Sequence, residues 1–538
     1  MDKSKSLLVF AIFYFLLPVL SYAQVDTAWV RRYNGPGNYD DYAYAIAVDD
    51  SGNVYVAGRS YASTTNYDYA TIKYNSSGVQ QWVQRYSGPG NNWDEAIAIA
   101  VDGAGNVYVT GWSYSTTTNY DYATVKYNSA GVEQWVQRYN GAGNGMDRAN
   151  AMVLDGQGNV HVTGYSQGAG IDFNYATIKY NSSGVLQWIA GYDGTANSDD
   201  HAYAITVDDS GYVYVTGGSR NSGTWIDYTT VKYDADGGSI WIRSYNGPGN
   251  NEDRAHAIAV DGLGNVYVTG RSMMGMYHDY ATIKYNRDGD TVWVRRYSGP
   301  GNYQDEALAL ALDGQGNVYV TGWSEATGTY DDIATIKYDS AGVEQWVQRY
   351  NGPGNSNDRP SAIAVDSFGN IYITGYSVTS GNNYDYVTIK YNSAGVEQWV
   401  QRYNGPGNNL DEATAIAVDN SGNVYVTGFS RSSGSSDSED YATIKYVQTA
   451  GINELMGSGN GELRVSVYPN PARTFFTIHL PSAERTEIKI FDVMGKMVKE
   501  FESFGVGELR VPLDGIKNGI YFIKVDDMIC REKLIVTK

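Results

Sequence analysis

The chain has 538 residues, of which 42% are hydrophobic, 14% aromatic and 18% charged, and it contains 62 glycines and 49 tyrosines. This apolar fraction can build a core, so the composition excludes a disordered chain and favours an all-β chain with many turns. The formal net charge of -20 repels phosphate backbones, so we expect no nucleic-acid partner.

The first 23 residues have the organisation of a signal peptide. Lys3 and Lys5 precede an apolar run from Leu7 to Leu20, and residues 21–23 (SYA) fit a cleavage site. The apolar run is short for a membrane span, Pro18 interrupts it, and we see no second run further along. We therefore expect an exported protein without a transmembrane segment.

Eight tryptophans recur at a nearly constant interval over the next 400 residues or so: Trp29, Trp82, Trp135, Trp188, Trp241, Trp293, Trp346 and Trp399. Each of them opens a copy of the same pattern, WVQRYNGPGN, DEAIAIAVD, GNVYVTG and DYATIKY, with small variations. A fixed period of this size is typical of repeat architectures and determines how the whole fold is interpreted.

Each repeat predicts four strands. In the second copy, Ala96 to Val101 alternates small and large apolar residues, while residues 107–110 and 123–127 are rich in β-branched and aromatic residues. The Trp segment is the fourth strand. Glycines in the turns at 102–106 and 128–132 suit tight hairpins, and the other two connections are longer. Because strand direction alternates, we expect the tight turns on one face and the long loops on the opposite face, the long-loop face.

A single sheet of about 50 residues cannot bury both of its faces, whereas a ring of four to eight such sheets can, as a β-propeller. The first repeat begins with a Trp strand, residues 29–33, that has no YATIKY strand before it. The last repeat ends at Tyr441 to Tyr446 with no Trp strand after it. We therefore predict an all-β fold, an eight-bladed β-propeller over residues 24–446, closed by its N-terminal strand.

The repeat stops after Tyr446. Residues 447–463 form a Gly/Ser-rich linker, and residues 464–538 have a different composition, with more Lys, Glu and Phe and no Trp. We expect a small C-terminal β-sandwich domain there. The four predicted parts of the chain are thus the signal peptide (1–23), the propeller (24–446), the linker (447–463) and this domain (464–538).

The repeated units D-x-A-x-AIAVD-xxGNVYVTG resemble the bacterial β-propeller repeat family, often called SBBP repeats. The resemblance covers about residues 25–446. It implies the propeller fold and says almost nothing about activity.

The C-terminal segment resembles the type IX secretion system (Por) sorting domain, through motifs at residues 468–471 (YPNP), 488–492 with 495–496, 519–523 and 533–536. The resemblance implies a small β-sandwich that an outer-membrane translocon recognises and a sortase-like enzyme removes. Translocon and sortase would then be partners through residues 464–538, and the protein would be secreted or held on the outer cell surface.

One aspartate stands at the start of the AIAVD strand in every repeat: Asp41, Asp94, Asp147, Asp200, Asp253, Asp305, Asp358 and Asp411. If this strand is innermost, the eight carboxylates surround the channel entrance on the long-loop face and could bind a ligand or Ca²⁺. The alternative, which we favour, is that each aspartate binds backbone amides and fixes its own loop. The aspartates that start the tight turns and the lysines of the YATIKY strands are interpreted as structural.

The loops that follow the GxS segment differ between copies and carry Tyr, Trp, Asn and Ser. Trp93 and Tyr303, just before two of the aspartates, belong to positions that vary in the same way, so they join the candidate ligand-binding residues. A rigid scaffold with diverse loops on one face is how binding surfaces are built. The alternative is unrestrained drift of the loops.

These patterns favour a non-enzymatic binding or adhesion module for a carbohydrate, peptide or protein partner on the long-loop face. We assign no catalytic residue and no cofactor, with Ca²⁺ left as a possible metal. The competing hypothesis is an extracellular polymer-degrading hydrolase or lyase that uses carboxylates at the channel mouth, such as Asp40, Glu95, Glu306 or Glu412. A structural spacer is the third. The five histidines have no partner at metal-ligand spacing, so His-based chemistry is not expected.

Overall fold

The computed structural model describes residues 24–379, 383–433 and 438–449, and in the C-terminal region residues 467–468, 475–480, 485–492, 497–504, 507–513, 515–517, 519–525 and 528–536. One compact unit spans Val25–Gln448, and the C-terminal strands belong to a second unit. The predicted signal peptide and most of the predicted linker lie outside the described residues. No helix in the described part of the chain is long and apolar enough to cross a membrane.

The first unit consists of eight four-stranded sheets, which we number as blades 1 to 8. Blades 1 to 4 are β2 (Asp41–Val48), β3 (Val54–Ala62), β4 (Asn66–Tyr74), β5 (Gln80–Tyr86); β6 (Asp94–Val101), β7 (Val107–Ser115), β8 (Asn119–Tyr127), β9 (Glu133–Tyr139); β10 (Asp147–Leu154), β11 (Val160–Gln167), β12 (Phe173–Tyr180), β13 (Leu186–Tyr192); and β14 (Asp200–Val207), β15 (Val213–Arg220), β16 (Ile226–Tyr233), β17 (Ser239–Tyr245). Blades 5 to 7 are β18 (Asp253–Val260), β19 (Val266–Met274), β20 (Tyr277–Tyr285), β21 (Thr291–Tyr297); β22 (Asp305–Leu312), β23 (Val318–Ala326), β24 (Tyr330–Tyr338), β25 (Glu344–Tyr350); and β26 (Asp358–Val365), β27 (Ile371–Val378), β28 (Tyr384–Tyr391), β29 (Glu397–Tyr403). Blade 8 is β30 (Asp411–Val418), β31 (Val424–Arg431), β32 (Glu439–Thr449) and β1 (Gln24–Tyr33).

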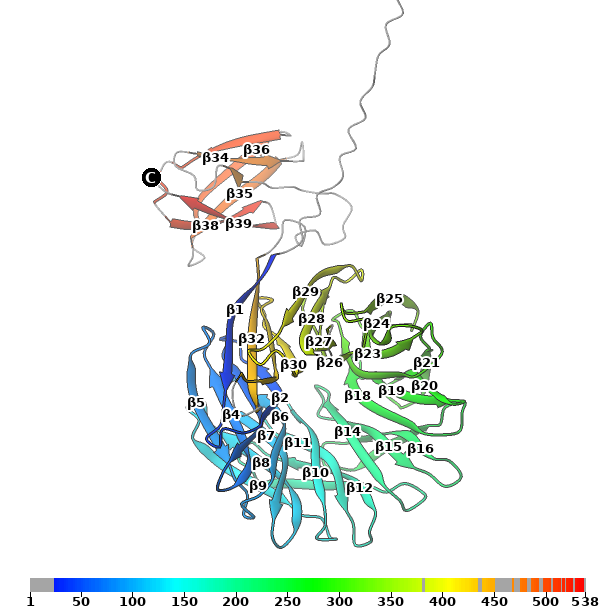
Figure 1. Cartoon of the computed structure of the whole chain (residues 1–538). Helices are drawn as coiled ribbons and strands as arrows, with labels where there is room; N and C mark the ends of the chain where they lie inside the picture. The colour runs from blue at the N-terminus through cyan, green and yellow to red at the C-terminus, as the bar shows by residue number, and fades with distance from the viewer. Residues whose placement is uncertain are drawn as a thin grey trace, which may run out of the picture. The chain divides into compact units, whose positions relative to one another are not determined.

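The eight blades form a closed ring. The first strand of each blade lies against the first strands of both neighbours, and β30 lies against β2, so the circle has no open end. Blade 8 has the strand order β1-β32-β31-β30, and Figure 1 shows β1, in blue, beside β32, in orange. The predicted fold, an eight-bladed propeller closed by the N-terminal strand, is therefore confirmed.

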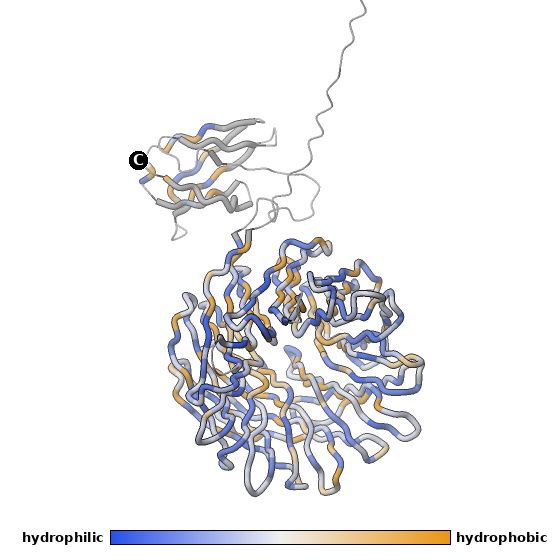
Figure 2. Tube along the Cα trace, viewed as in Figure 1, coloured by the Kyte–Doolittle hydropathy of each residue, from blue (hydrophilic) through white to orange (hydrophobic). Residues whose placement is uncertain are grey.

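The core lies between neighbouring blades rather than within one sheet. Side chains alternate along each strand, and Figure 2 shows hydrophilic and hydrophobic positions alternating along the blades. Between blades 1 and 2, for example, Tyr55 and Tyr69 pack against Val107 and Val109, and all four are completely buried. The Tyr69 hydroxyl also donates to the Ala123 carbonyl oxygen in blade 2, at 3.0 Å, so the polar end of the ring is satisfied.

The repeated tryptophan joins each blade to the next one. Trp82 of blade 1 donates from Nε1 to the Ser129 carbonyl oxygen of blade 2 at 3.2 Å, and Lys73 Nζ donates to the same oxygen at 3.1 Å. The indole lies on Gly131, whose φ is +83°, and a Cβ at that glycine would come within 2.8 Å of the ring. This contact of Trp, Lys, carbonyl and glycine, which we call the blade clasp, therefore requires glycine at the turn.

The clasp between blades 7 and 8 is made differently, because the chain has no turn between β32 and β1. Trp399 Nε1 and Lys390 Nζ donate instead to the side-chain Oε1 of Gln448, at 3.3 and 2.6 Å. The Gln448 amide nitrogen donates in turn to the Tyr372 hydroxyl at 3.1 Å and to the Gly422 carbonyl at 2.6 Å. The Gln448 side chain thus replaces the missing backbone carbonyl at the point of closure.

The second unit has two sheets. One has the order β33 (Val467–Tyr468), β34 (Phe475–Leu480), β37 (Gly507–Pro512), and the other β36 (Met497–Phe504), β35 (Arg485–Asp492), β38 (Gly519–Val525), β39 (Met528–Val536). Ile488, Ile490 and Ile523 of the four-stranded sheet are completely buried. A small all-β unit at the C-terminus agrees with the predicted fold class.

We predict that Gln448→Ala destabilises the propeller by about 1–3 kcal/mol, because the indole N–H of Trp399 and the ammonium group of Lys390 lose their shared acceptor. The measurement is the free energy of unfolding in denaturant. The matched control is Gln398→Ala, since the half-buried Gln398 side chain donates to the Val396 carbonyl of its own turn. Equal stability of both variants would show that Gln448 does not hold the ring closed.

Candidate binding site at the inner ring

The eight predicted aspartates begin the first strands and are completely buried. In every blade the carboxylate Oδ2 accepts a hydrogen bond from the backbone N–H of the glycine six residues earlier, at 2.6–2.9 Å. In blades 1 to 5 Oδ1 also accepts from the backbone N–H twenty residues later, at 2.9–3.1 Å. Each carboxylate therefore faces its own long loop rather than the solvent, as the structural alternative describes.

Burial raises the pKa of Asp41, Asp94 and Asp305 to about 6, although the backbone and serine donors oppose the shift. Within the part of the chain that the structure describes, no three His, Cys, Asp or Glu side chains gather as metal ligands would. The predicted ring of aspartates thus shapes the loops, and a ligand that approaches from solvent meets other side chains.

Those other side chains come from the positions beside the aspartates. The residue after each aspartate pairs in register with the residue before the GxS serine on the second strand of the same blade, as in Tyr42 with Arg59 and Glu95 with Trp112. Unlike the aspartates, these positions change from blade to blade, and most are half-buried. We call them the inner ring: Tyr42, Arg59, Glu95, Trp112, Arg148, Tyr165, His201, Gly218, Arg254, Arg271, Glu306, Trp323, Arg359, Tyr376, Glu412 and Phe429.

The contact between blades 1 and 2 contains the densest part of the inner ring. The Arg59 guanidinium pairs with Glu95 at 2.5 Å and lies over the rings of Tyr42 and Trp93, 4.4 and 5.0 Å from their centroids. The indole N–H of Trp93 donates to Glu95 at 3.1 Å. The structure therefore brings the predicted residue Trp93 into the candidate site. Tyr303, the other predicted aromatic, packs edge-on against Tyr277 at 5.7 Å.

The contact between blades 5 and 6 carries a network of charges. His256 Nε2 lies 2.8 Å from Glu306, and Arg271 bridges Glu306 at 3.2 Å and Glu252 at 2.6 Å. Burial by itself raises the pKa of Glu306. The hydrogen bonds and charges of His256 and Arg271 outweigh burial, so the pKa of Glu306 is lowered. Sequence reasoning gave His256 no partner. The repeat register contains the signal, since the residue after the aspartate of one blade, Glu306, lies beside the fourth residue of the first strand in the preceding blade, His256.

Glu412 of blade 8 differs from the other ring carboxylates. Burial raises its pKa to about 7, and the nearby Arg359 opposes this only in part. Arg359 itself pairs with Asp331 at 2.6 Å. Nearby in the closing blade, burial and the Asp40 carboxyl raise the pKa of Glu439 to about 7. Of the four carboxylates that a hydrolase could use, Glu95 and Glu306 are therefore ion-paired. Asp40 instead lies beside another carboxyl, that of Glu439, and Glu412 is held away from water by burial.

Exposed apolar side chains extend the surface over the long loops. Tyr39, Trp225, Met276 and Tyr330 expose 53%, 56%, 73% and 64% of their area. Tyr39, Trp225 and Met276 stand in the connections of the long-loop face, and Tyr330 begins β24 directly after such a connection, so they extend the apolar surface of that face.

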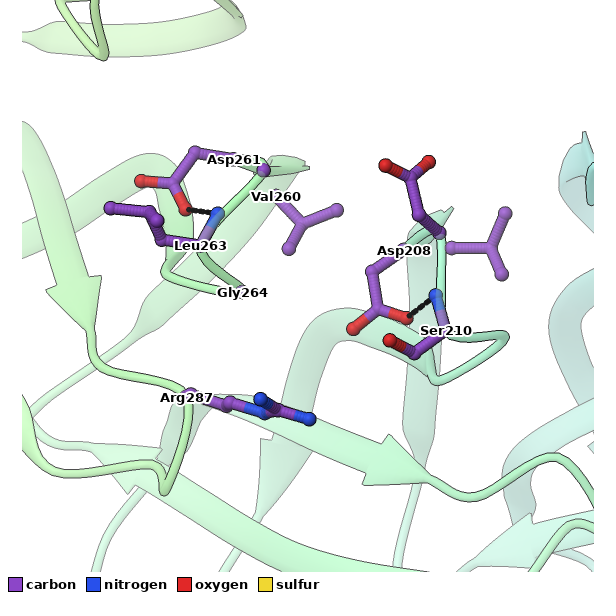
Figure 3. A pocket seen from close by; sticks show the side chains of 10 residues that line it. Asp208, Ser210, Val260, Asp261, Leu263, Gly264 and Arg287 are labelled. Carbon is purple, nitrogen blue, oxygen red and sulfur yellow. Dashed lines mark hydrogen bonds between the residues drawn. The ribbon is translucent and has the colours of Figure 1, made fainter.

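The tight-turn face has a hollow of another kind, between the turns of blades 4 and 5 (Figure 3). Asp208 and Asp261 each accept a backbone N–H within their own turn, at 3.0 and 2.9 Å. Arg287 reaches into the hollow from below both turns (Figure 3). These two aspartates are engaged in closing turns, as the sequence predicts, so the hollow is left with the Arg287 guanidinium and the exposed carboxylate of Asp209.

We predict that Glu412→Gln stabilises the protein at about pH 8 and leaves its stability unchanged at about pH 4. The pKa of the native carboxyl, about 7, lies above the ordinary glutamic acid value of 4.5, so its contribution to stability is complete at low pH and falls as the pH rises through 7. Thermal unfolding at the two pH values measures this. The control Glu306→Gln should instead destabilise at about pH 8, since it removes an ion-paired carboxylate. A Glu412→Gln variant no more stable than the native protein at high pH would contradict the assignment.

Two family models match the chain. One is described as a beta-propeller repeat and matches residues 28–63, 81–117, 240–272, 345–385 and 398–433, and the other is described as a secretion system C-terminal sorting domain and matches residues 466–537. The regulatory protein FlaEY of Caulobacter vibrioides is 32% identical over 115 residues, which are 19% of this chain and 12% of that protein. The alignment thus spans a small part of that relative.

Among solved structures, Sqt1 of Chaetomium thermophilum bound to the N-terminus of ribosomal protein L10 covers 79% of this chain and 100% of its own, with a TM-score of 0.51 and 9% identity. At that identity the likeness shows the fold alone. The repeats and the tail together identify the chain as a β-propeller repeat protein with a secretion-system C-terminal sorting domain, exported by type IX secretion to the cell surface or the extracellular space.

Proposed function

We propose that this secreted propeller is a binding or adhesion module that holds a carbohydrate, peptide or protein partner on its long-loop face. The observation that supports this most is the inner ring. The residues that make the clasps and the interblade cores repeat from blade to blade, whereas the inner ring carries six different pairs of residues over the eight blades, drawn from arginines, glutamates, a histidine, a glycine and aromatic rings. A rigid scaffold with a varied surface at one place suits recognition.

The chemistry of the ring supports a polar ligand with flat or apolar faces. Arg59 is held over two aromatic rings and against Glu95, so its orientation is fixed before any ligand arrives. Fixed side chains lose little conformational entropy on binding, which strengthens the interaction. Exposed rings on the surrounding loops, such as Trp225 and Tyr330, add area for stacking against sugar rings or peptide side chains.

An extracellular hydrolase or lyase is the second candidate, and Glu412 supports it. A general acid works best when its pKa lies near the working pH, and the pKa of about 7 meets that condition. The Asp40 and Glu439 carboxyls would be the further acidic groups of such a site. The ion pairs of Glu95 and Glu306 favour a binding role for those two residues over proton transfer.

The C-terminal unit supports a separate set of partners. We propose that the type IX translocon and its sortase recognise residues 464–538, so that the tail directs export while the propeller carries the binding surface. On this proposal residues 464–538 do not bind the ligand of the propeller.

The test uses the mature chain from residue 24 on glycan and peptide arrays, with product analysis of every bound polymer. We expect binding without turnover, reduced by about tenfold or more in Arg59→Ala, because a charged contact of this kind contributes about 1.5–3 kcal/mol. The control is Arg287→Ala on the tight-turn face, which should bind normally. A released product that disappears in Glu412→Gln would contradict the binding role and establish the enzyme. Binding that survives in Arg59→Ala but not in Arg287→Ala would place the site on the other face.

A further inference from the structure

The arginines of the inner ring have carboxylate partners, with one exception. Arg59 pairs with Glu95, Arg254 and Arg271 pair with Glu252, and Arg359 pairs with Asp331. Arg148 in blade 3 has no carboxylate within ion-pair distance among the described residues. Its guanidinium lies over the Trp112 and Tyr120 rings, 4.5 and 5.5 Å from their centroids, and close to the Tyr165 hydroxyl.

Aromatic rings of the neighbouring blades surround this part of the inner ring. Arg359 has the same position in blade 7 as Arg148 in blade 3, and it pairs with Asp331 of the preceding blade. The residue equivalent to Asp331 in front of Arg148 is Tyr120, so a ring stands where the other blade supplies a carboxylate. On the side of blade 4, His201 packs against Tyr165 with 4.3 Å between ring centroids and an interplanar angle of 47°.

A half-buried guanidinium without an anion carries an unbalanced cost of desolvation. The Nε atoms of Arg59, Arg148 and Arg271 are all buried without a hydrogen-bond partner, but only Arg59 and Arg271 have an ion pair beside them. The ion pairs elsewhere in the ring offset that cost within the protein, whereas at Arg148 the anion can come from a ligand. The planar fork of arginine matches a carboxylate in two parallel hydrogen bonds, so a carboxylate group is the fitting partner.

The surroundings of the guanidinium favour a sugar as the carrier of that carboxylate. Tyr120 and Tyr165 are half-buried rings beside it, and half-buried His201 packs against Tyr165; their polar atoms can reach sugar hydroxyls while their faces pack on the C–H side of a pyranose. The net charge of -20 repels a densely charged polymer at long range, but screening over about 8 Å in physiological salt leaves the isolated arginine free to attract one nearby carboxylate.

From this arrangement we infer that Arg148, set among Trp112, Tyr120, Tyr165 and His201, is a subsite for a hexuronate residue of an extracellular glycan. The inference rests on the proposed binding function and names the chemical class of its ligand. It concerns one segment of the inner ring, in blades 2 to 4, and gives Arg148 the role of the specificity-determining residue.

The experiment is calorimetric titration of the full mature chain with trigalacturonate, with neutral galactotriose and with triglutamate as probes. The variants are Arg148→Gln and Arg148→Lys, and the control is Arg287→Gln, which alters another arginine beside a tyrosine ring, on the tight-turn face. Position 148 should tolerate substitution, because Tyr, Glu and His occupy the equivalent place in other blades. Far-UV circular dichroism and thermal unfolding confirm that each variant is folded.

We expect trigalacturonate to bind, Arg148→Gln to weaken that binding by about tenfold or more, Arg148→Lys to restore part of it, and Arg287→Gln to change nothing. Equal binding of trigalacturonate and galactotriose, or unchanged trigalacturonate binding in Arg148→Gln, would overturn the uronate subsite and leave the binding function standing. Preference for triglutamate would also overturn it and identify an acidic peptide ligand. Failure of all three probes would overturn the uronate subsite, and if the arrays also show no ligand, the binding function fails with it.

Discussion

The whole propeller depends on the contact between a tryptophan and the glycine turn of the next blade. The indole needs a turn without a side chain, and its N–H needs a carbonyl that also accepts the lysine ammonium group. Each copy of the repeat must therefore present both halves of the contact at a fixed distance along the chain, which explains the constant interval between tryptophans. An insertion between the tryptophan and the glycine turn would change the distance between these two halves of the contact. Substitutions near the propeller axis leave the contact unchanged.

This division explains where function can reside. Interblade packing uses all the strands of a blade, and the buried aspartate at the start of each first strand is constant, but the residue after that aspartate and its partner on the second strand are free to change. The inner ring uses that freedom: Arg59 is anchored by Glu95, Glu306 is shared by His256 and Arg271, and Arg148 has rings around it in place of a carboxylate. Eight similar blades thus produce a surface without eightfold symmetry, which can recognise one ligand in one orientation.

The fold was predictable from sequence because the pattern of every strand and turn occurs eight times. The closing strand was predictable because the first Trp strand has no YATIKY strand before it and the last YATIKY strand has no Trp strand after it. The site was predictable only in part. The aspartates attract notice by repetition, but their burial depends on which face of the strand they occupy, which spacing alone leaves open. Trp93 was found because it varies. Arg148 and His256 were missed because their contacts lie across blades, and Gln448 was missed because it stands outside the repeat.

Ring closure by the N-terminal strand is the central claim, and thermal unfolding of a chain that lacks residues 24–33 measures it most directly. The deletion removes the Trp29 half of one clasp, the ion pair of Arg32 with Asp440 at 2.9 Å, and the outer strand of blade 8. The account predicts a large drop in the unfolding temperature together with a broadened transition. An unfolding curve that coincides with that of the complete mature chain would contradict it.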